Sequence, residues 1–554
     1  MIIKFERTPE ELYRLSRAAL SRGEPDRALL YGEDALRGKG STEYKVSCAE
    51  ILVAMGRYND AVNIGLEALC YGVGMRSELY DMMARVSSEL GHFYESLHFL
   101  AKKAHYDGDE DTLDAMDEVI EELDAEREAG RGERDFFIVG KEARPKRSDP
   151  TSLLRANFAL NHGEYAEAIR IASETERDSE HYIDAQMICL RAYLKRREQD
   201  AAEKAAEEIV RLDPGNGFAL YVLIDRFKRK EYIPMLADVE RGGSELYYAI
   251  LAAESLSDHA LATRLSERLI AENRYVPGAY FVAAAVALNS GDRRGSEGHL
   301  HTLFSLYRKY PQEVILEGWR RLKKCEVGFS GRVPFEIVRI LENYLKKHAH
   351  DSEEFVQSML TDAAFRSAVI LVLEEGGRKV NQKILSYLAE RENQQVDSFF
   401  AKVLLRYDVD LLLKKEVFAT LYRRKDKGRL FIAQSVVPIR VSCVKTPRFA
   451  SYPENLRRAY CDVYSFLICM TDAICEERLR TLAERASKLE GAEDLSVEVL
   501  CGALLYRLLA EGQIPVGTDL PSEEEGCRFL LQFVFGYRRV NMARIRLLAA
   551  ILSD

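Results

Sequence analysis

The chain has few residues that break helices, and it has no long apolar run. Only 14 of its 554 residues are proline, and one residue is tryptophan. No run of 18 consecutive apolar residues occurs, so the sequence predicts no transmembrane helix and no membrane partner. Residues 1–10 lack a long apolar run behind a basic start, and we therefore expect no signal peptide.

Disulfide and catalytic signatures are also missing. The ten cysteines are scattered, and no two have Cys-x-x-Cys spacing, so we expect reduced thiols in a cytoplasmic protein. The chain lacks the glycine-rich phosphate loop, the Gly-x-Ser-x-Gly elbow and the His-Glu-x-x-His metal motif. His299 and His301 are two residues apart, which on a helix keeps them from sharing a metal ion. We expect no catalytic residue, no cofactor and no metal.

Positive charge is scarce in one segment. The net charge is -10, and residues 107–128 contain 12 acidic residues against one arginine. An acidic balance argues against a nucleic-acid partner, because phosphate contacts require a basic surface. We interpret the acidic segment as a solvated helix face, with a dock for a basic partner as the alternative.

The chain does contain a recurrent turn. Residues 161–172 predict a tight turn between two helices, in which Gly163 takes the left-handed conformation that ends a helix. Other turn positions follow in register, 33 to 35 residues apart within each group: Gly23, Gly56 and Gly91; Gly163 and Arg197; Ser257 and Gly291.

Small residues recur at fixed distances from these turns. Alanine stands five residues after a turn or seven residues before one, at Ala28, Ala61, Ala168, Ala202 and Ala262 and at Ala49, Ala84, Ala156 and Ala284. Ser96 and Ser296 replace alanine in two units, and Pro214 ends a second helix. We expect neighbouring helices to touch at these small side chains.

This pattern resembles the tetratricopeptide repeat over residues 8–104 and 151–310. The resemblance implies an all-α superhelix of helix pairs with a concave groove that binds a peptide or protein segment. An unrelated helical bundle with coincidental glycine spacing is the alternative. The carboxylate-clamp class of these repeats would place a ligand asparagine at Asn157, but Leu153 replaces the clamp lysine. We interpret Asn157 as an ordinary polar residue of the concave face. Because the first repeat starts near residue 8, the peptide-sensing regulators with an N-terminal DNA-reading domain are disfavoured.

The remaining segments are less regular. Residues 312–324 predict a basic helix in which Trp319 packs or caps the array, and residues 429–443 predict a short β-hairpin. Residues 136–139 form an apolar plug in a linker, expected to dock on a helix, with a recognition peptide as the alternative. Short helices in 346–425 resemble HEAT repeats by rhythm alone. The predicted segments are 1–105, N-terminal repeats; 106–150, acidic helix and linker; 151–345, central repeats; 346–425, HEAT-like helices; 426–450, β-prone; and 451–554, C-terminal helices.

Together these features predict a non-catalytic scaffold that binds a protein or peptide partner, whose identity the residues do not specify. Two other functions fit the same sequence. One is a sensor whose superhelical pitch changes when it binds a peptide. The other is an enzyme with an unrecognised site in the last 200 residues.

Overall fold

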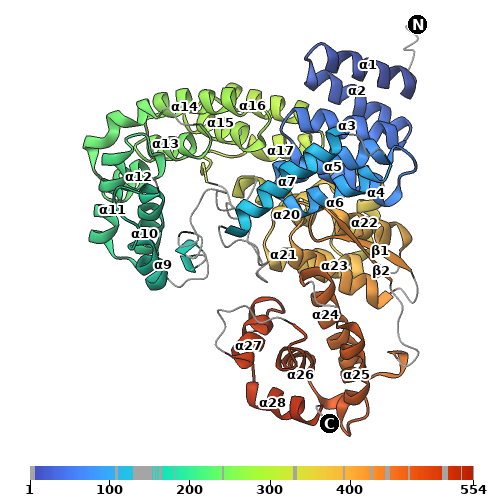
Figure 1. Cartoon of the computed structure of the whole chain (residues 1–554). Helices are drawn as coiled ribbons and strands as arrows, with labels where there is room; N and C mark the ends of the chain where they lie inside the picture. The colour runs from blue at the N-terminus through green and yellow to red at the C-terminus, as the bar shows by residue number, and fades with distance from the viewer. Residues whose placement is uncertain are drawn as a thin grey trace.

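The helices and strands come from a computed structural model that describes most of the chain. The described residues are 7–106, 110–128, 153, 156–157, 159–160, 165–179, 181–239, 242–328, 333–390, 393–424, 428–442, 449–471, 475–514, 522–537 and 540–552. Over these ranges the protein is all-α, apart from one two-stranded antiparallel sheet (Figure 1). Gly163 and the apolar plug at 136–139 lie outside the described residues.

The N-terminal block is built from three helix pairs followed by one long helix. Gly23, Gly56 and Gly91 connect the two helices of successive pairs, with φ angles of 72°, 68° and 73° that only glycine adopts readily. The first helix begins with a capping box formed by Thr8 and Glu11. The elements are α1 (Pro9–Ser21), α2 (Pro25–Gly38), α3 (Thr42–Ala54), α4 (Tyr58–Tyr71), α5 (Arg76–Glu89), α6 (Phe93–Ala104) and α7 (Glu110–Glu128).

The spacing of Leu113, Met116, Val119, Ile120 and Leu123 predicts an apolar seam along α7, and this prediction is partly wrong. Among residues 111–120 of this helix, Thr112 and Val119 are buried, and the helix packs against α6. Leu113 and Ile120, which the sequence placed in the seam, are 53% and 40% exposed. Over residues 111–120 the helix therefore buries a narrower and more polar face than its apolar residues suggest.

The central array continues the pattern of helix pairs. Arg197, Ser257 and Gly291 form turns with φ angles of 63°, 59° and 88°. Its elements are α9 (Tyr165–Ala172), α10 (Tyr182–Arg196), α11 (Gln199–Leu212), α12 (Gly217–Tyr221), the π-helical turn η1 (Val222–Arg226), the 3-10 helix η2 (Lys230–Asp238), α13 (Ser244–Ser255), α14 (His259–Glu272), α15 (Pro277–Asn289), α16 (Arg293–Leu306) and α17 (Gln312–Trp319). Residues 217–238 form an irregular further unit around Lys228, whose φ is 57°.

Small residues lie where the two helices of a pair cross. The nine alanines at the predicted positions are at most 2% exposed. Where serine replaces alanine, its hydroxyl bonds to the facing helix. The Ser96 hydroxyl donates to the carbonyl of Ala84 over 2.9 Å, and the Ser296 hydroxyl donates to the carbonyl of Ala284 over 2.6 Å. Close contact between these backbones is therefore compatible with either residue.

The C-terminal region contains shorter helices and the hairpin. Its elements are α18 (Phe335–His348), α19 (Ser352–Thr361), α20 (Ala363–Glu375), α21 (Arg378–Ala389), α22 (Gln394–Leu405), α23 (Leu411–Arg424), β1 (Arg429–Ala433), β2 (Pro438–Ser442), η3 (Phe449–Ser451), α24 (Glu454–Met470), α25 (Glu476–Ala486), η4 (Ala492–Asp494), α26 (Val497–Ala510), α27 (Glu523–Phe533) and α28 (Met542–Ile551). Phe431 pairs with Arg440, and Pro438 opens β2 opposite Ala433. Helix α18 runs across residue 345, where the sequence placed a boundary.

Two further features bear on the sequence predictions. The helix expected over residues 312–324 ends at Trp319, and residues 322–328 have no regular secondary structure. The prediction is confirmed for residues 312–319 and wrong for 320–324, where the chain leaves the helix and residues 322–328 contact other helices.

No single helix among the described residues has the length and apolarity to cross a membrane. The bent pair α19–α20 meets these criteria only when both helices are combined.

The chain folds back on itself instead of forming one continuous superhelix. Figure 1 shows α9 to α16 as a curved arc, with α10, α12, α13 and α15 on its inner side and α11, α14 and α16 outside. The N-terminal block lies beside the far end of this arc, near α17, α22 and the hairpin. Its apolar core includes Leu405, Ala433 and Val436 from the C-terminal region.

Candidate functional site

Two helices on the inner side of the arc, α12 and α13, carry a group of aromatic side chains that are neither fully buried nor fully exposed. We name Phe218, Tyr221, Tyr247 and Tyr248 the inner aromatic cluster; they come from α12 and α13. The Tyr248 ring lies edge-on to Phe218 at 4.9 Å and stacks on Tyr221 at 6.2 Å between centroids. Such rings offer an apolar surface with hydroxyls at its edge, which suits contact with another polypeptide.

A cation extends this cluster toward the start of the array. Arg191 lies on α10 with an exposed side chain, and its guanidinium carbon is 5.4 Å from the centre of the Phe218 ring. This cation–π contact orders the guanidinium and leaves its hydrogens available to a carboxylate. Burial, followed by the Asp225 carboxylate, raises the pKa of Tyr221, so its hydroxyl is a neutral hydrogen-bond donor.

Toward the other end of the array, the residues that follow α17 contact α13, the end of α15 and the start of α16. We name residues 322–328, which follow α17, the inner segment. The Asn289 carboxamide accepts from the N–H of Cys325 over 3.0 Å and donates to the carbonyl of Cys325 over 2.9 Å. The Tyr247 hydroxyl donates to the carbonyl of Val327 over 3.3 Å. Helix α13, which supplies two of the four rings of the inner aromatic cluster, thus also contacts the inner segment.

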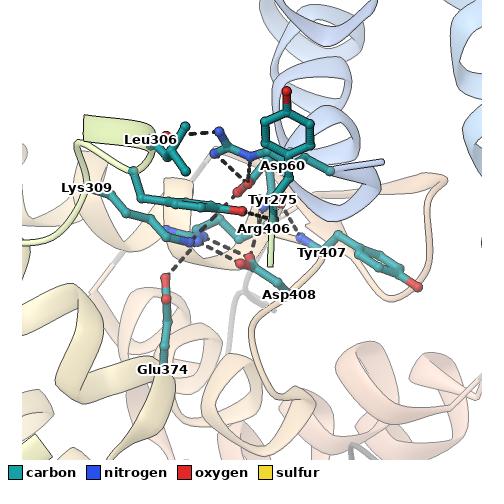
Figure 2. Close-up of polar contacts among 11 residues, drawn as sticks. Asp60, Tyr275, Leu306, Lys309, Glu374, Arg406, Tyr407 and Asp408 are labelled. Carbon is teal, nitrogen blue, oxygen red and sulfur yellow. Dashed lines mark hydrogen bonds and ion pairs between the residues drawn. The ribbon is translucent and has the colours of Figure 1, made fainter. Parts of the chain in front are cut away.

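A charged junction joins the N-terminal block to the end of the array. The Arg57 guanidinium donates to Asp60 over 2.8 Å and to the carbonyl of Leu306 over 3.1 Å, and it lies 4.0 Å from the centre of the Tyr307 ring. Lys309 approaches Asp60 at 3.8 Å (Figure 2). The turn that ends α16 is therefore held by the second helix pair of the N-terminal block.

The junction continues into the C-terminal region. Figure 2 shows Arg406 between Glu374 and Asp408, at 2.7 and 2.8 Å. Asn63 donates to Asp408 over 3.0 Å and accepts from the N–H of Tyr407 over 2.7 Å. Burial alone would lower the pKa of Arg406, but the two carboxylates outweigh it and raise the pKa, so the side chain stays charged. These contacts fix how three distant parts of the chain meet.

The residues singled out from the sequence are mostly structural. The alanines named above lie inside helix crossings, and Pro214 follows the end of α11. Asn157 is half-buried beside the fully buried Ala156, and its place on the concave face remains a prediction. Across the residues that the structure describes, no three metal-binding side chains gather. The aromatic cluster and Asn289 were missed, because no local pattern marks residues that meet from separate helices.

Comparisons with known proteins give only distant similarities. No protein-family model matches the sequence, and no curated protein matches it. Yeast Tom70 superposes with a TM-score of 0.28 at 12% identity, covering 86% of this chain and 95% of that one. The Cut9 chain of an APC/C Cut9–Hcn1 assembly gives 0.25 at 11% identity, covering 99% and 90%. The structure of the TPR2AB domain of yeast Sti1 in complex with pHSP90 gives a TM-score of 0.20 at 11% identity. The match covers 54% of this chain and 98% of that chain.

The repeat type follows from this chain's own geometry. Its helices pack in consecutive antiparallel pairs, its turn residues have positive φ, and its turns recur every 33 to 35 residues within a group. Nothing supports the resemblance of residues 346–425 to HEAT repeats. Over the described residues the fold is all-α, with consecutive helix pairs arranged as in a tetratricopeptide-repeat solenoid and one small antiparallel sheet.

Proposed function

We propose that this chain is a non-catalytic interaction scaffold that binds an extended segment of a partner protein along the inner side of its central array. The observation that carries the proposal is the inner aromatic cluster with Arg191 beside it. Tyrosine, phenylalanine and arginine are enriched in protein interfaces, and tyrosine and arginine are frequent hot spots. Stacked repeats present such residues as one continuous surface.

The cluster is already ordered before any partner arrives. Three rings contact Tyr248, and the Arg191 guanidinium is held over Phe218. Because these side chains lose little conformational freedom on binding, more of the contact energy remains as affinity. The combination of an apolar shelf and a cation suits a segment that has an apolar side chain next to a carboxylate.

We place this activity in the cytoplasm. The nine cysteines that the structure describes are all free thiols, and eight of them are buried. Free thiols in this number fit a reducing compartment better than an oxidising one. Free-thiol titration of protein isolated under alkylating conditions tests this, and a disulfide among these nine cysteines would contradict it.

Site-specific photocross-linking tests the binding surface. p-Benzoylphenylalanine placed at Phe218 on the inner side is compared with the same probe at Arg264, an exposed residue of the outer helix α14. We expect one partner to be captured from Phe218, and we expect Arg191→Glu to reduce that capture by about ten-fold. Equal capture of the same partner from Arg264 would contradict the proposal.

A further inference from the structure

We propose that the inner segment occupies a peptide-binding groove over α13 and α15, and that a partner peptide of the same chemistry exchanges with it. That chemistry is an extended chain with small or β-branched apolar side chains two residues apart. This inference rests on the proposed function and deepens it, because it identifies the kind of partner segment and what holds its place.

Asn289 recognises the backbone of the inner segment. Its one carboxamide pairs with both the N–H and the carbonyl of Cys325. This is the hydrogen-bond pattern that a neighbouring strand would offer, so it accepts an extended peptide whatever its side chains are. The Tyr247 hydroxyl donates a hydrogen bond to the carbonyl of Val327, and Arg293 donates to the carbonyl of Leu322 over 2.8 Å.

The side chains of the inner segment alternate as in a bound peptide. Cys325 and Val327 are 1% and 6% exposed, whereas Lys324 and Glu326 between and beside them are exposed. An extended chain turns successive side chains to opposite sides, so residues two apart share one face. The segment thus buries two small apolar side chains, which serve as its anchors in the proposed groove, and leaves the intervening side chain in solvent.

The Asn289 carboxamide is oriented for this contact by neighbouring side chains. The Asn289 amide nitrogen also donates to Glu254 over 2.7 Å, and His259 lies 3.2 Å from the other oxygen of that carboxylate. Glu254 is therefore a positioning residue that fixes which end of the carboxamide faces the Cys325 carbonyl. A preformed hydrogen-bonding group binds the backbone with little reorganisation.

The covalent connection of the inner segment to the array determines how strongly a separate peptide must bind to replace it. The segment follows α17 directly, so its effective concentration at the groove is high. A separate peptide must compete with it, and its apparent association constant equals the intrinsic one multiplied by the fraction of molecules in which the segment has left the groove. Weakening the anchor of the segment should therefore increase the affinity for a separate peptide.

The test uses the full chain and a fluorescent peptide with the sequence of residues 320–328, kept reduced. We expect Val327→Asp to bind this peptide at least about ten-fold more tightly than wild type, because the buried anchor is lost. Adding Asn289→Ala to that variant should lose at least about ten-fold again. Lys324→Asp is the matched control, since it adds the same side chain at an exposed position and should bind as wild type does.

Equal binding by wild type and Val327→Asp, or no effect of Asn289→Ala, would overturn the inference. If Val327→Asp does not fold, hydrogen exchange in the wild type decides the question. Saturating peptide should then accelerate exchange at the Cys325 amide, and unchanged exchange would overturn the inference. Photocapture of a partner at Phe218 is independent of these results, so the proposed function could stand while the inner segment proves to be a fixed linker.

Discussion

The indole N–H of Trp319 donates a hydrogen bond to the hydroxyl oxygen of Ser296 over 2.9 Å. The same hydroxyl donates to the carbonyl of Ala284. The only tryptophan of the chain thus closes the end of the central array through a serine that occupies a small-residue position. Serine serves there because an alanine would leave the buried indole N–H without its acceptor.

Replacing Ser296 should therefore destabilise the array more than replacing its counterpart Ser96. We expect Ser296→Ala to lower the free energy of unfolding by about 2–3 kcal/mol, because the Trp319 N–H is left unpaired. Ser96→Ala removes only the bond to Ala84 and should lower it by about 1 kcal/mol. Urea unfolding followed by tryptophan fluorescence and circular dichroism measures both. Equal effects of the two substitutions would contradict the role given to Trp319.

The turn glycines give a cleaner test of backbone conformation. A Cβ at Gly56 or at Gly40 would meet no atom within 4 Å, but only Gly56 has a positive φ, of 68°. We expect Gly56→Ala to lower the free energy of unfolding by about 1–2 kcal/mol, and Gly40→Ala to leave it unchanged or raise it by about 0.5 kcal/mol. Thermal unfolding of the pair separates conformation from packing. If Gly40→Ala lowers the free energy of unfolding as much as Gly56→Ala does, the positive φ of Gly56 does not explain the effect.

The charged junction should govern how the N-terminal block is held. Arg57 is nearly buried, and Arg57→Ala removes its contacts with Asp60, Leu306 and the Tyr307 ring. We expect this substitution to lower the free energy of unfolding by about 3 kcal/mol. We also expect faster hydrogen exchange in α3, α4 and the turn after α16. Arg27→Ala is the control, since Arg27 pairs with Glu24 while 69% exposed and should change stability by less than about 0.5 kcal/mol. Unchanged exchange at both faces of the junction would argue against this docking.

A buried lysine should make stability depend on pH. Lys414 is fully buried in α23 and donates to the carbonyl of Ala433. Burial lowers its pKa from 10.5 to about 8. The unfolded chain keeps this proton up to about pH 10.5, whereas the folded chain releases it near pH 8, so folding is favoured as pH rises through that window. Below pH 8 both states are charged, and the penalty is constant.

Lys414→Met removes this penalty, and Lys347→Met at an exposed position is its control. We expect the Lys414→Met variant to be more stable than wild type at about pH 7 by on the order of 3 kcal/mol, and the gap to narrow as pH rises toward about 10. Urea unfolding at several pH values between about 7 and 9.5 measures the gap. A gap that does not vary with pH would show that Lys414 keeps its proton in the folded protein.

The repeats could be predicted because each turn depends on nearby residues. A glycine that ends a helix and an alanine five residues later mark a unit without reference to the rest of the chain. The unit at 217–238 escaped this pattern, since Tyr221 and Ile233 stand where alanine is expected around Lys228. The chain forms a π-helical turn and a 3-10 helix in this unit in place of a regular helix pair.

The candidate site could not be predicted in the same way. Residues 320–324 are compatible with a helix, but the chain leaves the helix after Trp319 and residues 322–328 bind Asn289 and Tyr247 instead. These partners are 36 and 80 residues away from the groups they contact. Local sequence carries no signal for such contacts, and the same holds for Arg191 over Phe218.

Hydrogen exchange of the full chain with and without its captured partner tests the central claim most directly. We predict protection on the inner helices α10, α12, α13 and α15, centred on the residues around Tyr248, with the outer helices α11, α14 and α16 unchanged. Protection confined to the outer helices, or to the exposed face of α7, would contradict the claim that the inner side of the array is the binding surface.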